Sequence, residues 1–241
     1  MRLRVNVSQL AAALSVLLLA AGCQLLGVGE RNLLENPGFE SGREGWSWRE
    51  HSPHWSDFEI VDVPVRSGHG AAHLSLHHGP EDPPRSTGIF GVVQEIPPDV
   101  VPERVGGWYR VDRWEKSDPR IHLYLQFVAI VWGDPRTPEI VNPKRPPRNL
   151  ENYQLRYYLA GADRPAFQLL NGVVLLVSPE LPEIGQWTHF EVSLKDDLLE
   201  YWQVVPEGHE YIRLLFEARW DRLPPGGSIA AEVTFDDLYA R

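Results

Sequence analysis

The sequence has almost no cysteine: Cys23 is the only one among 241 residues. A single thiol cannot form a disulfide within the chain. The folded part must therefore be held together by buried apolar side chains, alone or together with a bound metal ion.

Basic residues are outnumbered, with 23 Lys and Arg against 33 Asp and Glu and a formal net charge of −10 at pH 7. An acidic surface repels phosphate groups. This balance argues against nucleic acid as a partner and against binding to anionic lipid through charge. The charge balance says little for or against a neutral sugar as a ligand.

Recognisable catalytic motifs are also missing. The sequence contains no Gly-x-Ser-x-Gly elbow for a serine nucleophile. Glycoside hydrolysis needs a positioned pair of carboxylates, and no pattern marks two of the many acidic residues as partners. We therefore expect a protein that is not an enzyme.

The N-terminus predicts export. Arg2 and Arg4 precede an apolar run at 10–22, which ends in small residues. The run is shorter than the roughly 20 apolar residues that a membrane span requires, so it is typical of a signal peptide. Residues 1–22 are predicted to be this signal and residues 23–31 a tether.

The segment LLAAGC, which ends at Cys23, resembles the signal of bacterial lipoproteins, although Ala20 stands where those signals prefer leucine. The resemblance implies that Cys23 is acylated and becomes the new N-terminus. Gln24, where an aspartate would favour the inner membrane, implies anchoring in the outer membrane of the cell envelope, facing the periplasm or the surface. An ordinary signal peptide is the alternative.

Several segments alternate between apolar and polar residues, which is typical of strands with one face on a core and one face in water. In 71–78, Ala72, Leu74 and Leu76 share one face. The same pattern occurs at 121–132, 186–194 and 210–220. Prolines and glycines separate these runs, so the sequence predicts an all-β fold, an antiparallel β-sandwich or jelly roll, over 32–241 as a single domain.

One segment differs from the rest. Around 195–205, Leu198, Leu199 and Trp202 are spaced for one face of a helix, which predicts a short connector helix. The stretch 133–152 is rich in proline and too polar for a core, and loops of that length are commonly functional or mobile.

The stretch NLLENPGFESGREGW at 32–46 closely resembles the opening of carbohydrate-binding modules with the galactose-binding-like jelly-roll fold. Further segments resemble the family in the same order, at 66–76, 91–96, 105–112, 185–194, 205–218 and 231–241. The resemblance implies that fold for nearly all of 32–241. The departure is 133–177, which is longer than the family leads us to expect and could hold an inserted hairpin or lid.

The resemblance also implies a structural calcium ion between the first and last strands, held by Glu40 and by Asp236 or Asp237. Hard cations prefer such oxygen ligands. Strand alternation places the two aspartates on opposite faces, so both stay candidates. A solvated or salt-bridged group of acids is the alternative.

A sugar stacks on aromatic side chains, while arginine, glutamine and similar groups bond its hydroxyls. The residues of these types on expected wet faces or loops are Trp108, Arg110, His122, Tyr124, Gln126, Trp132 and Arg213. Together with the resemblance, they predict a lipid-anchored, non-catalytic envelope protein that recognises a poly- or oligosaccharide.

Two other functions stay open. The same fold can serve as a scaffold for an envelope protein partner, because a fold does not determine a function. Some jelly-roll polysaccharide lyases work from a sheet face with Tyr, His and Arg, and His122, Tyr124, His189 and Arg213 are residues of these types.

Overall fold

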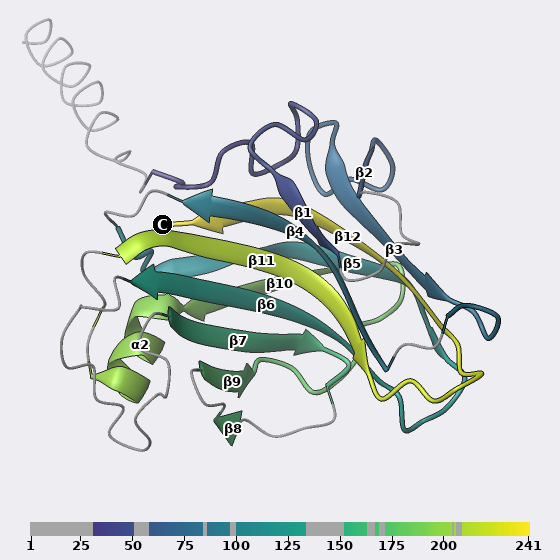
Figure 1. The fold of residues 1–241 in the computed structure, drawn as a ribbon. Helices are drawn as coiled ribbons and strands as arrows, with labels where there is room; N and C mark the ends of the chain where they lie inside the picture. The colour runs from purple at the N-terminus through teal and green to yellow at the C-terminus, as the bar shows by residue number, and fades with distance from the viewer. Residues whose placement is uncertain are drawn as a thin grey trace, which may run out of the picture. The chain divides into compact units, whose positions relative to one another are not determined.

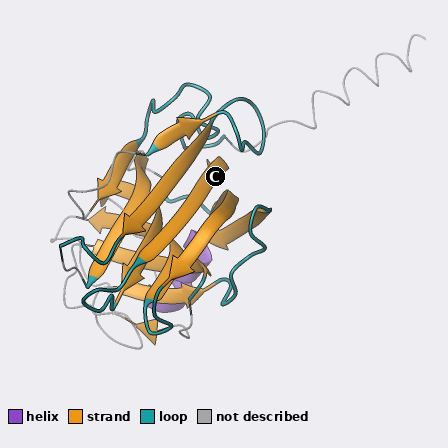
Figure 2. Cartoon of the chain, turned by 90° about the vertical axis from the view of Figure 1, so that its right-hand side faces the viewer, coloured by secondary structure: helices purple, strands orange, loops and turns teal. Residues whose placement is uncertain are grey.

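The computed structural model describes residues 31–50, 58–83, 86–96, 100–133, 152–162, 167–168, 172–203, 205 and 209–241. The segment Asn32–Arg241 forms one compact unit. It consists of two β-sheets that pack face to face and one short helix (Figures 1 and 2). Cys23 and the predicted signal and tether lie outside the described residues, except for Arg31, so they stay predictions.

The larger sheet has seven strands in the order β1-β4-β11-β6-β7-β9-β8. Neighbouring strands are antiparallel except β7 and β9, which are parallel. Their bounds are β1 Ser47–Glu50, β4 Thr87–Ile96, β6 His122–Gly133, β7 Asn152–Ala160, β8 Phe167–Gln168, β9 Gly172–Leu176 and β11 His209–Asp221.

The smaller sheet has five antiparallel strands in the order β10-β5-β12-β3-β2. Their bounds are β2 Glu59–Val61, β3 Ala71–His78, β5 Arg104–Lys116, β10 Trp187–Ser193 and β12 Ile229–Ala240. The last strand in the chain, β12, thus lies at the centre of its sheet. The predicted fold class, an antiparallel β-sandwich jelly roll, is confirmed.

The core between the sheets consists of the apolar residues that the alternating sequence pattern predicted to face inward. Phe216 of β11 lies at its centre, and its ring centroid is 5.1 Å from that of Phe127 and 5.8 Å from that of Phe235. Phe190 and Trp46 also approach Phe216, each at 6.1 Å. Both sheets and the opening stretch therefore contribute to one apolar cluster, and each such side chain contributes about 1.5–3 kcal/mol when fully buried.

The opening stretch is a compact turn that places Phe39 in this core with no exposed surface. Asn36 and Phe39 have positive φ angles of 46° and 57°. The Asn36 carbonyl accepts a hydrogen bond from Trp46 Nε1 at 3.0 Å, and its side-chain oxygen accepts one from the Ser41 amide. The amide of Leu33 donates to the carbonyl of Ala240 at 2.7 Å, which joins the first described residues to the last strand.

The helix α2 (Leu194–Trp202) confirms the predicted connector, with one correction. Leu194, Leu198 and Trp202 are buried, whereas Leu199 is 44% exposed. The buried stripe follows the spacing i, i+4, i+8, and this places Leu199 about 100° away from it. In the part of the chain that the structure describes, no helix is long and apolar enough to cross a membrane.

The described part of 133–177 adds β7, β8 and β9 to one side of the larger sheet. Because β7 and β9 are parallel, a crossover connects them rather than a hairpin turn. Residues 134–151 lie outside the described residues.

Candidate functional site

The candidate sugar-binding residues are divided between two faces of the sandwich. His122, Tyr124 and Gln126 lie on the outer face of the seven-stranded sheet, and Arg213 shares that face from β11, opposite Ile130. Trp108 and Arg110 lie on β5, on the outer face of the five-stranded sheet. The side chain of Trp132 is outside the described part. The structure therefore does not bring these residues together in one site.

Part of the expected wet face of the larger sheet is buried, which corrects the sequence interpretation. Tyr124 is only 5% exposed and Gln126 is not exposed at all, whereas His122 and Arg213 are partly exposed. Two further apolar clusters lie on this outer face. One is formed by Tyr124, Tyr158, Ala162 and Val174, and the other by Val93, Val128 and Leu215 with Ile130 packed against it. Alternation indicates the face of a side chain but not what packs around it on neighbouring strands.

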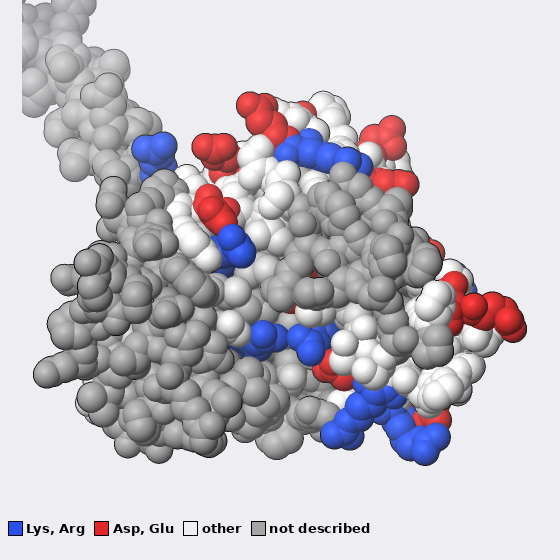
Figure 3. Space-filling view, in the orientation of Figure 1, with Lys and Arg blue, Asp and Glu red and all other residues white. Residues whose placement is uncertain are grey.

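Tyr124 is fixed by a charged neighbour. Its hydroxyl donates a hydrogen bond to Asp221 Oδ2 at 2.7 Å, and Arg219 donates two to Asp221 Oδ1, at 3.0 and 3.2 Å. Burial is the main reason why the pKa of Tyr124 lies well above its ordinary value. The phenol is therefore neutral and acts as a donor. Figure 3, which views this face, shows acidic and basic side chains side by side on its coloured part.

Gln126 and Glu217 form a fully buried pair on the same outer face, in which Gln126 Nε2 donates to Glu217 Oε2 at 2.6 Å. Gly91 lies opposite Glu217 on β4. A β-carbon at Gly91 would lie 2.8 Å from Glu217 Cγ, so the glycine allows the glutamate to lie close to the sheet. Gln126 Oε1 has no hydrogen-bond partner among the described atoms.

A partly exposed group of polar and aromatic side chains lies on the same face, two rows of side chains away from Gln126 and Glu217. We call it the polar band. Arg213 donates to Glu95 Oε1, with its Nε at 3.0 Å, and its guanidinium carbon lies 4.9 Å from the ring centroid of Tyr211. On β7, Arg156 Nη2 donates to Gln154 Oε1 at 3.0 Å. The polar band consists of Glu95, Ile130, Gln154, Arg156, Tyr211 and Arg213. It offers donors, acceptors and apolar surface on four neighbouring strands.

The five-stranded sheet carries on its outer face a row of rings, which we call the aromatic row. The Trp108 ring lies 5.0 Å from that of His189, and His189 lies 6.2 Å from Tyr239 with only 24° between the ring planes. Guanidinium groups flank the row: that of Arg66 is 4.4 Å from the Trp108 ring, and that of Arg241 is 4.6 Å from the Tyr239 ring. Both distances are within the range of cation–π attraction.

Tyr239 lies flat across β5 because Gly106 has no side chain. A β-carbon there would be 2.4 Å from Tyr239 Oη. The hydroxyl donates to Glu191 Oε2 at 2.7 Å. Burial and Glu191 raise the pKa of Tyr239 to about 12, and the hydrogen bond from Tyr239, with Arg104 nearby, lowers the pKa of Glu191.

Sequence reasoning named Trp108 as a sugar-binding candidate and His189 only for the lyase alternative, and it missed Tyr239 and the row that the three rings form. His189 and Tyr239 come from strands on either side of β5, so their meeting depends on strand order. One signal was available: Gly106 and Gly107 interrupt a strand, and glycine in a strand often marks close approach by another group.

The expected metal ligands Glu40, Asp236 and Asp237 converge on one loop, 66–70. Asp236 Oδ2 accepts hydrogen bonds from the amides of Arg66 at 2.6 Å and Ser67 at 3.2 Å. Asp237 Oδ1 accepts from the Ser67 hydroxyl at 2.7 Å, and both Glu40 oxygens accept from the amide of His69 at 2.9 Å.

A bulge in β12 explains why the two aspartates reach the same loop. The pairing of β12 with β5 shifts between Asp236 and Tyr239, and Asp237 has a φ of 48°. The simple alternation assumed from the sequence therefore does not hold here. Burial raises the pKa of Asp236, and the three amides that donate to it oppose this effect.

The three carboxylates suit a hard cation by donor type, and their oxygens face one region beside Gly38. A β-carbon on Gly38 would lie 3.7 Å from Asp236 Oδ1, 3.7 Å from Asp237 Oδ1 and 3.8 Å from Glu40 Oε1. As arranged, no three His, Cys, Asp or Glu side chains in the described ranges are close enough to hold a metal ion. Calcium needs oxygens at 2.3–2.6 Å, so the carboxylates would have to move inward from their amide partners.

No family model matches the chain, and no curated protein is similar to it. Solved structures with a related shape include TmCBM61 in complex with β-1,4-galactotriose, at 15% identity and a TM-score of 0.40 over 88% of this chain and 99% of that one. Another is CBM28, a carbohydrate-binding module specific for non-crystalline cellulose, at 15% identity and a TM-score of 0.41 over 85% and 92%. A third is the catalytic domain of Humicola grisea Cel12A in complex with a thio cellotetraose. It is 16% identical, with a TM-score of 0.30 over 88% of this chain and 98% of that one. At these identities and TM-scores, the likenesses carry no argument about the function of this chain.

Proposed function

We propose that the protein is a non-catalytic carbohydrate-binding protein of the cell envelope that recognises a poly- or oligosaccharide through the outer face of its seven-stranded sheet. The polar band is the observation that carries this proposal. Arg213, Glu95, Gln154 and Arg156 stand on the outside of a sheet, where the core requires none of them.

The chemistry of the polar band suits a chain of hydroxyl groups. Guanidinium and amide groups donate, the carboxylate accepts, and hydrogen bonds to charged groups are the stronger ones. Arg213 is held by Glu95, and Arg156 by Gln154, so these side chains are fixed before a ligand arrives. Ile130 and the Tyr211 ring offer apolar surface for the C–H side of a sugar.

The described carboxylates Glu95, Glu217 and Asp221 of this face do not form a hydrolytic pair. Glu217 and Asp221 are four residues apart on β11, which separates them by about 13 Å. Glu95 pairs with Arg213, four residues from Glu217 in the other direction, so the same spacing along the sheet separates Glu95 from Glu217. Glycosidases need carboxyl groups about 5–9.5 Å apart. The described part of the face therefore favours binding over hydrolysis.

The polysaccharide lyase alternative also loses support from the geometry. His189 lies on the five-stranded sheet, whereas His122, Tyr124 and Arg213 lie on the seven-stranded sheet. The Tyr124 hydroxyl donates a hydrogen bond to Asp221, and its pKa is raised, which opposes the use of Tyr124 as a base near neutral pH.

The test compares two arginine variants of a chain that begins at Arg31 and keeps the whole core. Arg213→Ala should weaken binding to the glycan found in an array screen by about tenfold or more, as expected for a lost charged hydrogen bond. Arg120→Ala is the matched control, because Arg120 is also paired with a nearby acid but lies in a loop. No binding to any glycan by the parent chain would favour the scaffold function instead.

Two further proposals complete this function. We propose a structural calcium ion at Glu40, Asp236 and Asp237, supported by the convergence of their oxygens beside Gly38. We also propose that acylated Cys23 anchors the protein in the outer membrane, supported by the sequence LLAAGC.

A further inference from the structure

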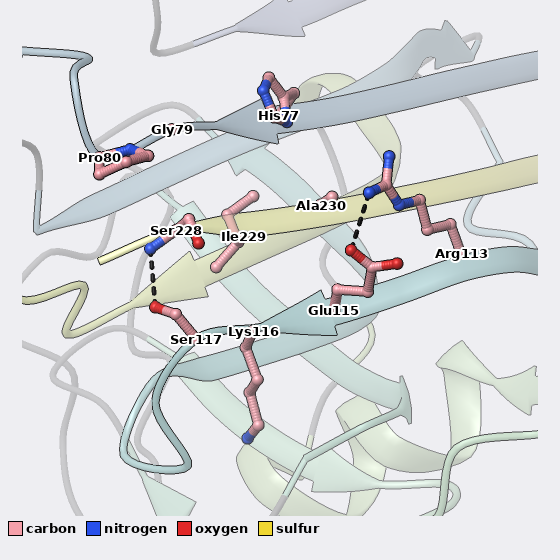
Figure 4. Close-up of a pocket in the computed structure, with 10 residues that line it drawn as sticks. All are labelled: His77, Gly79, Pro80, Arg113, Glu115, Lys116, Ser117, Ser228, Ile229 and Ala230. Atoms are coloured by element: carbon pink, nitrogen blue, oxygen red, sulfur yellow. Dashed lines mark hydrogen bonds and ion pairs between the residues drawn. The ribbon is translucent and has the colours of Figure 1, made fainter. Parts of the chain in front are cut away.

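The outer face of the five-stranded sheet contains a hollow at the end away from the aromatic row. It has a volume of about 380 Å³. Its lining residues are His77, Gly79, Pro80, Arg113, Glu115, Lys116, Ser117, Ser228, Ile229 and Ala230 (Figure 4). Neither the predicted nor the proposed binding surface includes these residues.

The hollow exists because a small residue lies between two larger ones. Ala230 of β12 pairs with His77 of β3 on one side and with Glu115 of β5 on the other. Residues directly opposite each other share a face, so His77 and Glu115 form walls above the floor at Ala230. Pro80 closes one end (Figure 4).

The same end of the hollow is held on its β5 side by two hydrogen bonds (Figure 4). The amide of Ser228 donates to Ser117 Oγ at 2.8 Å, and the amide of Ser117 donates to the carbonyl of Ser228 at 3.0 Å. These bonds connect the end of β5 to the start of β12. The shape of the hollow is therefore set by strands and short connections that are already ordered.

The charges around the hollow are balanced. Arg113 Nη2 donates to Glu115 Oε2 at 2.8 Å, and this hydrogen bond lowers the pKa of Glu115. The Lys116 ammonium points away from the floor and donates to the carbonyls of Pro119 and Ile121. A strongly charged ligand would meet no excess of opposite charge, whereas a neutral molecule with many hydroxyls would find donors and acceptors.

We propose that this hollow binds a single neutral sugar unit, such as the end of a glycan chain. The volume is near the lower limit for ligand pockets. The Glu115 carboxylate can accept from two hydroxyls, Arg113 can donate, and Ala230 and Pro80 offer apolar contact. The ligand class rests on the proposed function. The hollow lies on the five-stranded sheet, whereas the polar band lies on the seven-stranded sheet. One protein molecule could therefore bind two saccharide chains at once.

The test uses amide chemical shifts of the chain from Arg31 on addition of the methyl glycosides of glucose, galactose, mannose and N-acetylglucosamine. At least one should shift the amides of Gly79, Ser117 and Ser228. Ala230→Leu fills the hollow from its floor and should abolish these shifts. Ser75→Leu places the same side chain on the same face beside Glu232 and should leave them unchanged.

Glu115→Gln provides a second variant, because this exposed change does not affect the core. It should weaken the response by about tenfold, as a hydrogen bond to a charged group is lost. No shift with any of the four sugars, or the same shifts in Ala230→Leu as in the parent, would overturn the proposal. Loss of polysaccharide binding in Arg213→Ala with these shifts retained would separate this site from the proposed one.

Discussion

At the scale of single residues, Gly106 is a position where an added β-carbon would collide both with a ring of the aromatic row and with the backbone of a neighbouring strand. The added atom would lie 2.4 Å from Tyr239 Oη and 2.6 Å from the carbonyl oxygen of Phe190. The second contact is with backbone, which cannot rotate away. Gly106 is therefore needed both for the aromatic row and for the pairing of β5 with β10.

Gly106→Ala should lower the free energy of unfolding by about 1–3 kcal/mol, as expected when a packed site is overfilled. Gly79→Ala is the matched control, because the nearest atom to its added β-carbon is 3.8 Å away. Denaturant unfolding of both variants measures the difference. Equal stability of the two variants would show that β5 has more room than the structure indicates.

Tyr239 gives a prediction about pH. Its hydroxyl bond lowers the pKa of Glu191 below the ordinary 4.5. A lowered carboxyl pKa in the folded state stabilises the protein above the unfolded pKa, and this contribution is lost as the pH falls through the folded pKa. Tyr239→Phe should therefore be less stable than the parent near neutral pH, and the gap should close in acid.

Unfolding midpoints at several pH values measure this gap. In a Glu191→Gln background the carboxyl is absent, so the stability difference caused by Tyr239→Phe should no longer shrink in acid through Glu191. A gap that persists unchanged in acid with Glu191 present would assign the effect to packing of the ring instead.

At the scale of elements, the bulge in β12 connects the last strand to the first turn. It directs Asp236 and Asp237 toward the loop that also holds Glu40. If calcium binds there only in the folded state, a hundredfold excess over its Kd adds about 2.7 kcal/mol of stability. A chelator should then lower the melting temperature of the parent.

Glu40→Gln should abolish the response to chelator, because a calcium ligand loses its charge. Glu44→Gln changes another exposed acid of the same turn and should keep the response. A parent melting curve that is identical with and without chelator would exclude a stabilising calcium ion.

The sequence was also most informative about the secondary-structure elements, in particular about which face of each strand points into the core. A period of two places Leu74, Leu125 and Phe216 in the core without knowledge of strand order. It could not show that Gln126 is buried, because that depends on Glu217 across the strand pair. It also could not show that Asp236 and Asp237 reach the same loop, because a bulge breaks the alternation on which the prediction relied.

At the scale of the whole molecule, the proposed lipid anchor sets where the protein acts. Cys23→Ser should leave an unprocessed or soluble exported protein, because a serine cannot be acylated as the cysteine is. Fractionation of cells that express the parent and the variant measures this. A variant that is processed and sediments with membranes like the parent would contradict anchoring at Cys23.

The position of β12 has a consequence for synthesis. The five-stranded sheet has β10 and β5 on one side of β12 and β3 and β2 on the other, yet β12 is the last of these strands to be made. Until it arrives, the two halves of that sheet have no strand to join them, and one side of the core lacks Val233 and Phe235. Completion of that sheet is therefore held back until the final strand is made, and during this interval the apolar surface that β12 will cover is open to association with other chains.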